Sequence, residues 1–118
     1  MAIAADLLRG STDAIILRFL MEQDSYGYQI NKDIEQLSDG QYQLSEATLY
    51  TAFRRLEKEG LITSYWGSEN SGARRRYYKI TDEGRTVYLS SVAEWDAAMD
   101  LIRKLIHLSD VDEKGKRG

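Results

Sequence analysis

The sequence predicts a mainly α-helical fold that carries a small β-ribbon and ends in a long helix. Apolar residues recur at helical spacing in three segments between residues 11 and 60. Two segments rich in Ile, Thr, Tyr and Trp follow between residues 61 and 81, and a long periodic segment runs from residue 82 to about residue 108. With 118 residues, 42% of them hydrophobic, the chain is sufficient for one small globular domain.

The first two helices are predicted from their apolar spacing. One runs from Ser11 to about Glu22, with Ser11 or Thr12 as N-cap and an earlier start at Leu7 and Leu8 as an alternative. The second runs from about residue 28 to residue 37, where the turn signal Asp39-Gly40 follows.

The third predicted helix has two distinct faces. It begins at Ser45, a good N-cap, and ends at Gly60, the usual residue for a left-handed C-terminal cap. At about 100° per residue, one face is an apolar stripe made of Leu49, Ala52, Phe53 and Leu56. The opposite face carries Ala47, Thr48, Tyr50, Thr51, Arg54, Arg55 and Lys58.

Two predicted strands, residues 61–67 and 75–81, are joined by the turn-forming residues Asn70-Ser71-Gly72. The aromatic side chains that we expect to pack this ribbon against the helices are Tyr65, Trp66, Tyr77 and Tyr78. The long helix follows, with Thr81 as N-cap and Gly84 tolerated in its first turn. Three helices followed by a two-stranded ribbon form the winged helix-turn-helix arrangement.

Composition excludes several kinds of chemistry. The absence of Cys and the single His107 argue against a metal site, and no nucleophile with a matching base is present, so we expect neither a cofactor nor an enzyme. The N-terminus lacks the pattern of a signal peptide, and no segment approaches the roughly 18 apolar residues of a membrane span. We therefore expect a cytoplasmic protein that does not bind membranes.

Charge is unevenly distributed along the chain. Residues 45–79 hold seven basic and four acidic side chains, a balance of +3, which leaves −6 for the rest of a chain whose net charge is −3. A cationic face on an acidic body is typical of a protein that binds DNA in one orientation.

The third helix and the ribbon are the predicted DNA-binding elements. An α-helix fits the major groove, where Arg and Thr side chains bind base edges. We expect Ser45, Thr48, Tyr50, Thr51 and Arg54 to contact DNA, small Ala47 to allow close approach, and Arg55 and Lys58 to lie nearer phosphates. The ribbon arginines predicted to reach phosphates or the minor groove are Arg74, Arg75 and Arg76. The alternative, a merely solvated polar face, does not account for this second cationic cluster.

Several motifs resemble those of PadR-type bacterial transcriptional regulators. They are Y-G-Y-Q-I at 26–30, L-S-E-A-T-L-Y at 44–50, R-R-L-E-K-E-G-L-I at 54–62, Y-W-G at 65–67, R-R-R-Y-Y-K-I-T at 74–81 and E-G at 83–84. The resemblance implies a homodimeric winged-helix repressor that binds an inverted repeat in a promoter. The family usually has proline after Thr-Leu-Tyr, where this chain has Thr51; this difference and the single C-terminal helix most resemble the short, drug-responsive members.

The long helix is the predicted dimerisation element. Its wide apolar stripe exceeds what so small a domain covers, so we expect a second copy to cover it. The stripe consists of Tyr88, Val92, Trp95, Met99, Ile102, Leu105 and Ile106. The predicted organisation is a winged-helix domain at 1–81, whose first helix adds to the dimer contact, a dimerisation helix at 82–108 and a disordered tail at 109–118.

Trp95 allows two interpretations. It packs in the dimer interface, or it also stacks with its symmetry mate on a planar aromatic ligand, with Ala14, Ser91, Ala98 and Met99 leaving room. Three functions therefore remain open: a ligand-responsive repressor, a repressor without an effector, and a winged-helix module that binds proteins.

Overall fold

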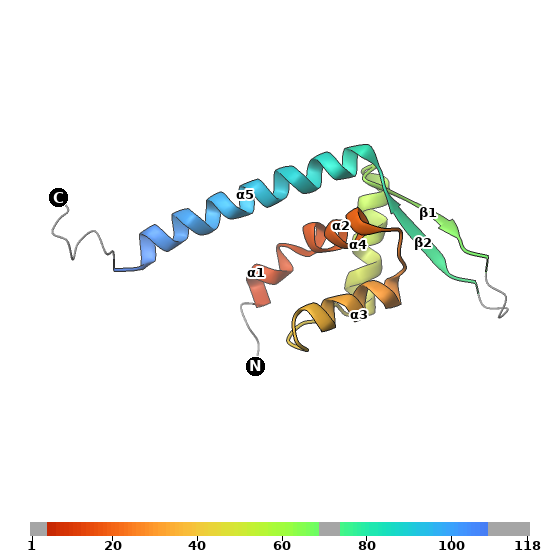
Figure 1. The fold of residues 1–118 in the computed structure, drawn as a ribbon, viewed down its shortest axis with the longest axis horizontal. Coiled ribbons are helices and arrows are strands. Elements are labelled where there is room, and N and C mark those ends of the chain that lie inside the picture. The colour runs from red at the N-terminus through yellow and green to blue at the C-terminus, as the bar shows by residue number, and fades with distance from the viewer. Residues whose placement is uncertain (1–4, 69–73, 109–118) are drawn as a thin grey trace. The chain divides into compact units, whose positions relative to one another are not determined.

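The computed structural model describes residues 5–68 and 74–108; the turn predicted at residues 70–72 and the tail predicted from residue 109 lie outside them. The elements are α1 (Ala5–Arg9), α2 (Thr12–Glu22), α3 (Gly27–Leu37), α4 (Glu46–Lys58), β1 (Ile62–Trp66), β2 (Arg76–Ile80) and α5 (Asp82–Ile106) (Figure 1). The predicted mainly helical fold with one ribbon is confirmed. The chain forms two compact units, residues 1–88 and 89–118, so the first turns of α5 belong to the first unit.

Helix ends follow the sequence signals closely in α4 and α5. The Ser45 hydroxyl oxygen accepts a hydrogen bond from the Thr48 N–H at 3.1 Å, and Gly60 has a positive φ of 78°. At the start of α5, the Thr81 hydroxyl oxygen accepts from the Gly84 N–H at 3.0 Å. These contacts confirm both predicted ends of α4 and the predicted start of α5, while α5 ends at Ile106 rather than at about residue 108.

The start of α2 differs from the expected cap. Ser11 occupies the N-cap position, but its hydroxyl donates back to the Leu7 carbonyl at 3.2 Å instead of capping. The Thr12 hydroxyl donates to the Arg9 carbonyl at 3.0 Å. Both hydroxyls thus bind carbonyl groups of α1. A turn at Gly10 and Ser11 separates the two helices, so Ala5–Arg9 is a short helix of its own rather than an early start of α2.

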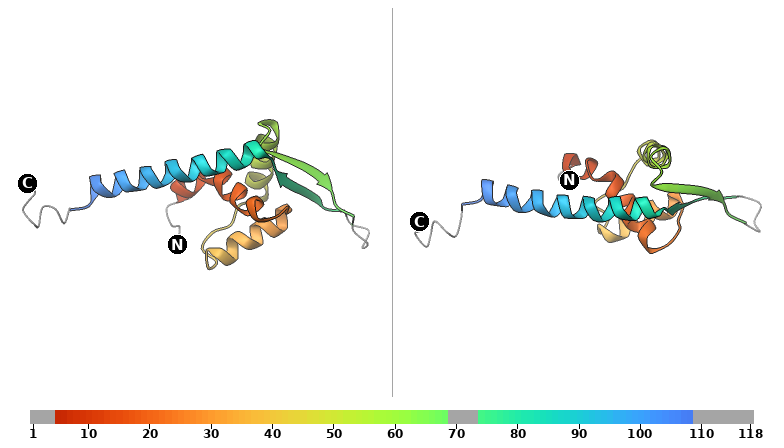
Figure 2. Two further views of the ribbon diagram at one scale, coloured as in Figure 1. Left: turned by 45° about the horizontal axis from the view of Figure 1, so that its top comes forward. Right: turned by 90° about the horizontal axis from the view of Figure 1, so that it is seen from above.

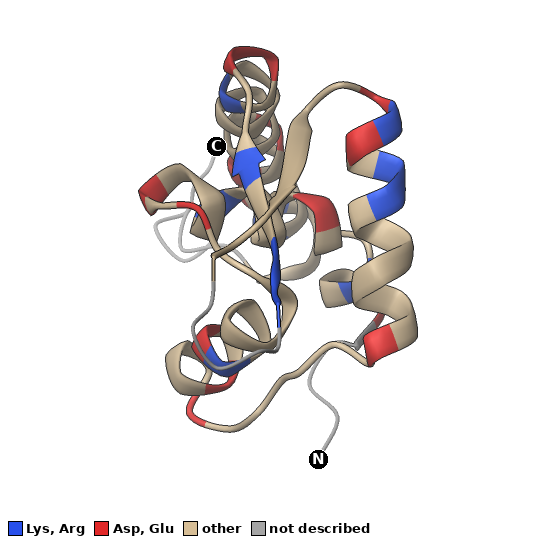
Figure 3. Ribbon diagram, turned by 90° about the vertical axis from the view of Figure 1, so that its right-hand side faces the viewer, with Lys and Arg blue, Asp and Glu red and all other residues tan. Residues whose placement is uncertain are grey.

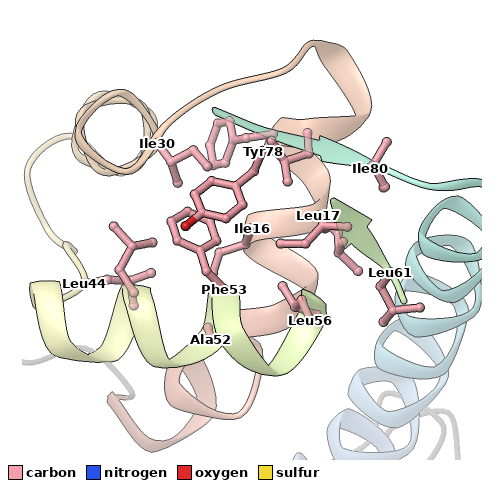
Figure 4. Close-up of a cluster of buried hydrophobic side chains, with 14 of the residues drawn as sticks. Ile16, Leu17, Ile30, Leu44, Ala52, Phe53, Leu56, Leu61, Tyr78 and Ile80 are labelled. Atoms are coloured by element: carbon pink, nitrogen blue, oxygen red, sulfur yellow. The ribbon is translucent and has the colours of Figure 1, made fainter. Parts of the chain in front are cut away.

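The core of the first unit lies between α2, α3, α4 and one face of the ribbon (Figures 2 and 4). At its centre the Phe53 and Tyr78 rings stack, with centroids 3.8 Å apart and planes 15° from parallel. The Asn31 side chain fixes the connection from α3 to α4, because it donates to the Leu44 carbonyl at 2.6 Å and accepts from the Leu44 N–H at 2.9 Å. The core therefore sets the orientation of α4.

β1 and β2 pair in antiparallel register from Ile62–Ile80 to Trp66–Arg76. Because side chains alternate along a strand, the face that buries Ile62 and Ile80 also carries Trp66 and Arg76 farther along the ribbon. The opposite face carries Tyr65, directly across from its strand partner in β2.

Gly84 has a stricter role than the tolerated position that the sequence suggested. A Cβ atom at this residue would lie 2.2 Å from the Leu61 carbonyl oxygen and 2.7 Å from Ile80 Cγ1. The first turn of α5 therefore packs directly on the chain that enters β1, and only glycine fits without displacement.

The part of α5 that lies in the second unit exposes large apolar side chains. The exposed fractions are 61% for Leu89, 47% for Trp95 and 72% for Leu105. Over the residues that the structure describes, no helix is long and apolar enough to cross a membrane.

Candidate nucleic-acid interface

α4 divides into the two predicted faces. Leu49, Ala52, Phe53 and Leu56 are buried in the core. All eight residues predicted to face DNA in this region are exposed: Ser45, Ala47, Thr48, Tyr50, Thr51, Arg54, Arg55 and Lys58. Within this face the Arg54 guanidinium donates to the Thr51 hydroxyl at 3.3 Å. A helix held on one side by the core and polar on the other has the form of a recognition helix.

A hollow of about 320 Å³ borders this face of α4. Thr48, Thr51 and Arg55 line it together with Ala47. Its other wall is formed by Arg9 and Thr12, from the junction of α1 and α2. These two residues could not be predicted as part of the interface, because only the folded chain brings residues so distant in sequence beside α4.

Arg55 is held by an ion pair with Asp13 of α2. The hydrogen bond to Asp13 raises the pKa of the Arg55 guanidinium, although partial burial opposes this. Both side chains are more than one-third exposed, so the pair contributes little to stability. It does fix where the Arg55 charge lies on the surface of α4.

Tyr50 lies against the start of α3. Its ring centroid is 5.5 Å from that of Phe53, and its hydroxyl is 2.6 Å from the place that a Cβ atom on Gly27 would occupy. A groove of about 280 Å³ runs beside it between α3 and α4. Tyr28 and Lys32 line this groove, and the Lys32 ammonium lies 5.8 Å from the Tyr28 ring centroid. Neither residue was predicted from the sequence to belong to the interface.

The ribbon arginines lie on two different faces, as the alternation of side chains along a strand requires. Arg76 is on the face toward α4, where its guanidinium donates to the Ser64 hydroxyl at 2.9 Å and lies 3.7 Å from the Glu57 carboxylate. The Ser64 hydroxyl in turn donates to Glu57 at 2.6 Å. This network ties the ribbon to α4.

Arg75 lies on the other face, with its guanidinium carbon 4.7 Å from the Tyr26 ring centroid. On that face Tyr77 packs edge-on against Tyr26 and stacks on Tyr65. The Tyr65 hydroxyl donates to Asp24 at 2.6 Å, and this hydrogen bond raises the pKa of the Tyr65 phenol.

The expectation that the ribbon aromatics pack toward the helices is therefore only partly correct. Tyr78 is buried on Phe53, and Tyr65 and Tyr77 contact the segment between α2 and α3. Trp66 does not pack inward. It is 52% exposed, and the guanidinium carbons of Arg74 and Arg76 lie 5.3 and 5.6 Å from its ring.

Positive charge gathers on α4 and β2, which both show blue in Figure 3. Across residues 5–68 and 74–108, no group of three His, Cys, Asp or Glu side chains is placed to hold a metal ion.

Trp95 and Ala98 on α5 are exposed, while Ser91 and Met99 are half-buried. Tyr88, which we expected in a dimer interface, packs on the core of its own unit. The remaining stripe residues predicted for that interface, Val92, Ile102, Leu105 and Ile106, are exposed. Ala14 on α2 is half-buried.

Helices α2, α3 and α4 pack together and leave one face of α4 exposed, and an antiparallel ribbon follows them. This arrangement defines a winged helix-turn-helix protein. The chain belongs to the transcriptional regulator PadR-like family, whose model matches residues 16–89.

Two solved structures and a sequence relative support this assignment. A transcriptional regulator from Clostridium thermocellum is 47% identical, with a TM-score of 0.82 over 89% of this chain and 99% of that one. A PadR family regulator from Eggerthella lenta is 35% identical, with a TM-score of 0.76 over 89% of each chain. The transcriptional regulator YqjI of Escherichia coli is 32% identical over 75 residues, which are 64% of this chain and 34% of that protein.

Proposed function

We propose that this protein is a homodimeric repressor that binds an inverted-repeat operator, with α4 in the major groove and the ribbon as a wing. The observation that carries the proposal is the exposed polar face of α4, which lies beside a ribbon bearing Arg74 and Arg76 while the core anchors the opposite face. Arg54 and Thr51 are the proposed base-contacting pair. Lys58 and Arg55 lie farther along α4 and suit phosphates.

The proposal of a dimer rests on α5. Leu105 and Ile106 of the predicted stripe are both 72% exposed, and so large an apolar stripe marks an interaction surface. A two-fold dimer would present two copies of α4 to successive major grooves about 34 Å apart. Sedimentation equilibrium should give twice the chain mass of 13.5 kDa. A mass of one chain at micromolar concentration would contradict the dimer.

DNA binding is tested with two arginine variants. Fluorescence anisotropy on a duplex taken from upstream of the gene should show that Arg54→Ala costs about 1–3 kcal/mol of binding free energy, as expected for a base contact. Arg74→Ala should reduce the slope of log affinity against log salt concentration by the amount expected for the loss of about one phosphate contact.

Arg18→Ala is the matched control, because Arg18 pairs with Glu22 on α2 and lies outside the proposed interface. If all three variants bind as the wild type does, the exposed faces of α4 and the ribbon do not bind DNA. If instead the wild type itself binds no DNA, a module that binds proteins would be the remaining interpretation.

We further propose that planar aromatic ligands bind between the two Trp95 rings at the dimer axis, beside Ser91, Ala98 and Met99, and relieve repression. The 47% exposure of Trp95 leaves ring surface available for stacking. In a Trp66→Phe background, where Trp95 is the only tryptophan, such a ligand should quench fluorescence. Unchanged tryptophan emission at micromolar ligand concentration would contradict ligand binding at Trp95. Trp95 would then be a packing residue, and the protein would be a repressor without this effector.

A further inference from the structure

Trp66 is placed unlike the other aromatic residues of the ribbon. It is the last residue of β1 and pairs with Arg76, the first residue of β2. Trp66 is 52% exposed, whereas Tyr78 on the same face of the ribbon is 4% exposed. Trp66 therefore adds little to the core, and the side chains of Arg74 and Arg76 lie against its ring.

Two guanidinium groups lie over the Trp66 ring, but they are held differently. Arg76 also binds Ser64 and Glu57, so its position is fixed without Trp66. Among the described residues, Arg74 contacts the Trp66 ring, with its guanidinium carbon 5.3 Å from the ring centroid. Removing the indole would therefore release Arg74 and leave Arg76 in place.

Stacking on a ring suits an arginine that must bind phosphate. An unrestrained Arg side chain loses up to about 2 kcal/mol of rotamer entropy when it is fixed, which weakens any contact that it makes. A cation–π contact uses the face of the guanidinium, whereas hydrogen bonds to phosphate use its N–H edge. The two interactions are therefore compatible in one side chain.

We propose that Trp66 is a positioning residue of the wing, which restrains Arg74 by stacking and leaves its N–H edge available to a phosphate of the DNA backbone. This inference rests on the proposed function, because it requires the ribbon to lie against DNA. Trp66 acts through Arg74, so its effect on DNA binding disappears when Arg74 is absent.

The test is a double-mutant cycle on a random-sequence duplex at low salt, because backbone contacts do not require the operator. Trp66→Ala should weaken binding about two- to fivefold, the range expected for an exposed cation–π contact. Trp66→Phe should retain most of the affinity, because it keeps a flat ring. Trp66→Leu, which keeps apolar bulk without a π face, should behave as Trp66→Ala does.

In the Arg74→Gln background, Trp66→Ala should change neither the affinity nor its salt dependence. An equal loss in both backgrounds, or full affinity of Trp66→Leu, would overturn the positioning role. The circular dichroism spectrum of each variant should match that of the wild type, which would exclude misfolding as the cause of a loss of affinity. If Arg74→Gln binds normally while Arg54→Ala does not, this inference fails and the proposed function stands; if the wild type binds no DNA, the proposed function itself fails.

Discussion

α4 and α5 are both amphipathic helices, but they differ in how their apolar residues are covered. α4 has 13 residues and buries Leu49, Ala52, Phe53 and Leu56 within its own unit. α5 has 25 residues, and Gly84 is the buried one among them. Similar periodicity in sequence therefore leads to an internal core in one case and to an exposed stripe in the other.

The difference follows from what surrounds each helix. α4 is enclosed by α2, α3 and the ribbon, whose apolar residues form one continuous cluster with it. Beyond residue 88, α5 belongs to a separate unit, and its Leu101, Ile102 and Leu105 are 40–72% exposed. So large an exposed apolar face is typical of an interaction surface, which is the basis of the proposed dimer.

Matched leucine truncations should separate the two helices most strongly. Leu56 is fully buried, so Leu56→Ala should lower the free energy of unfolding by about 2–5 kcal/mol. Leu105 is 72% exposed, so Leu105→Ala should leave the secondary structure intact and raise the dissociation constant of the dimer. Chemical denaturation and sedimentation measure the two effects.

The proposed difference between α4, which is covered within its own unit, and α5, which is exposed, would be contradicted if Leu105→Ala unfolded the chain as readily as Leu56→Ala. It would also be contradicted if Leu105→Ala left self-association unchanged, because the exposed stripe would then need another explanation.

Gly84 sharpens the boundary between the two parts of α5. Gly84→Ala forces a methyl group against the Leu61 carbonyl oxygen, so we expect a loss of about 1–3 kcal/mol of stability. Thr86→Ala, at an exposed position of the same helix, should change stability by less than about 0.5 kcal/mol. Equal thermal melting of Gly84→Ala and the wild type would show that this close contact is not required.

The smallest effect concerns pH and the core beneath α4. Burial raises the pKa of the Tyr78 phenol above its usual 10.0, so the folded state keeps a proton that the unfolded chain releases. This contribution to stability is complete below about pH 10 and is lost as the pH rises further. Between pH 9 and 11, roughly the range around the usual Tyr pKa, Tyr78→Phe should therefore lose less stability than the control Tyr28→Phe does. Tyr28 is a suitable control because it is 69% exposed. Identical pH profiles would contradict the assignment to Tyr78.

Much of the fold was predictable because its signals are local. Ser45 and Gly60 mark the ends of α4 through capping chemistry, and the spacing of Leu49 and Leu56 identifies its buried face. The alternation of side chains along a strand also indicated that Arg74, Arg75 and Arg76 divide between two faces.

The features that could not be predicted depend on contacts between distant segments. Nothing local shows that Asp13 pairs with Arg55, or that Arg9 lies beside Thr48. Trp66 has the sequence pattern of a packed strand residue, but the ribbon extends past the core before that position, and its ring meets arginines instead.

The most direct test of the account is a hydroxyl-radical footprint of the protein on the DNA upstream of its own gene. A dimer with one α4 in each of two successive major grooves should protect two segments on one face of the duplex, about 10 base pairs apart. The Arg54→Ala variant should lose both protections together. A single protected segment, or protection that Arg54→Ala leaves unchanged, would contradict the proposal that two copies of α4 bind DNA.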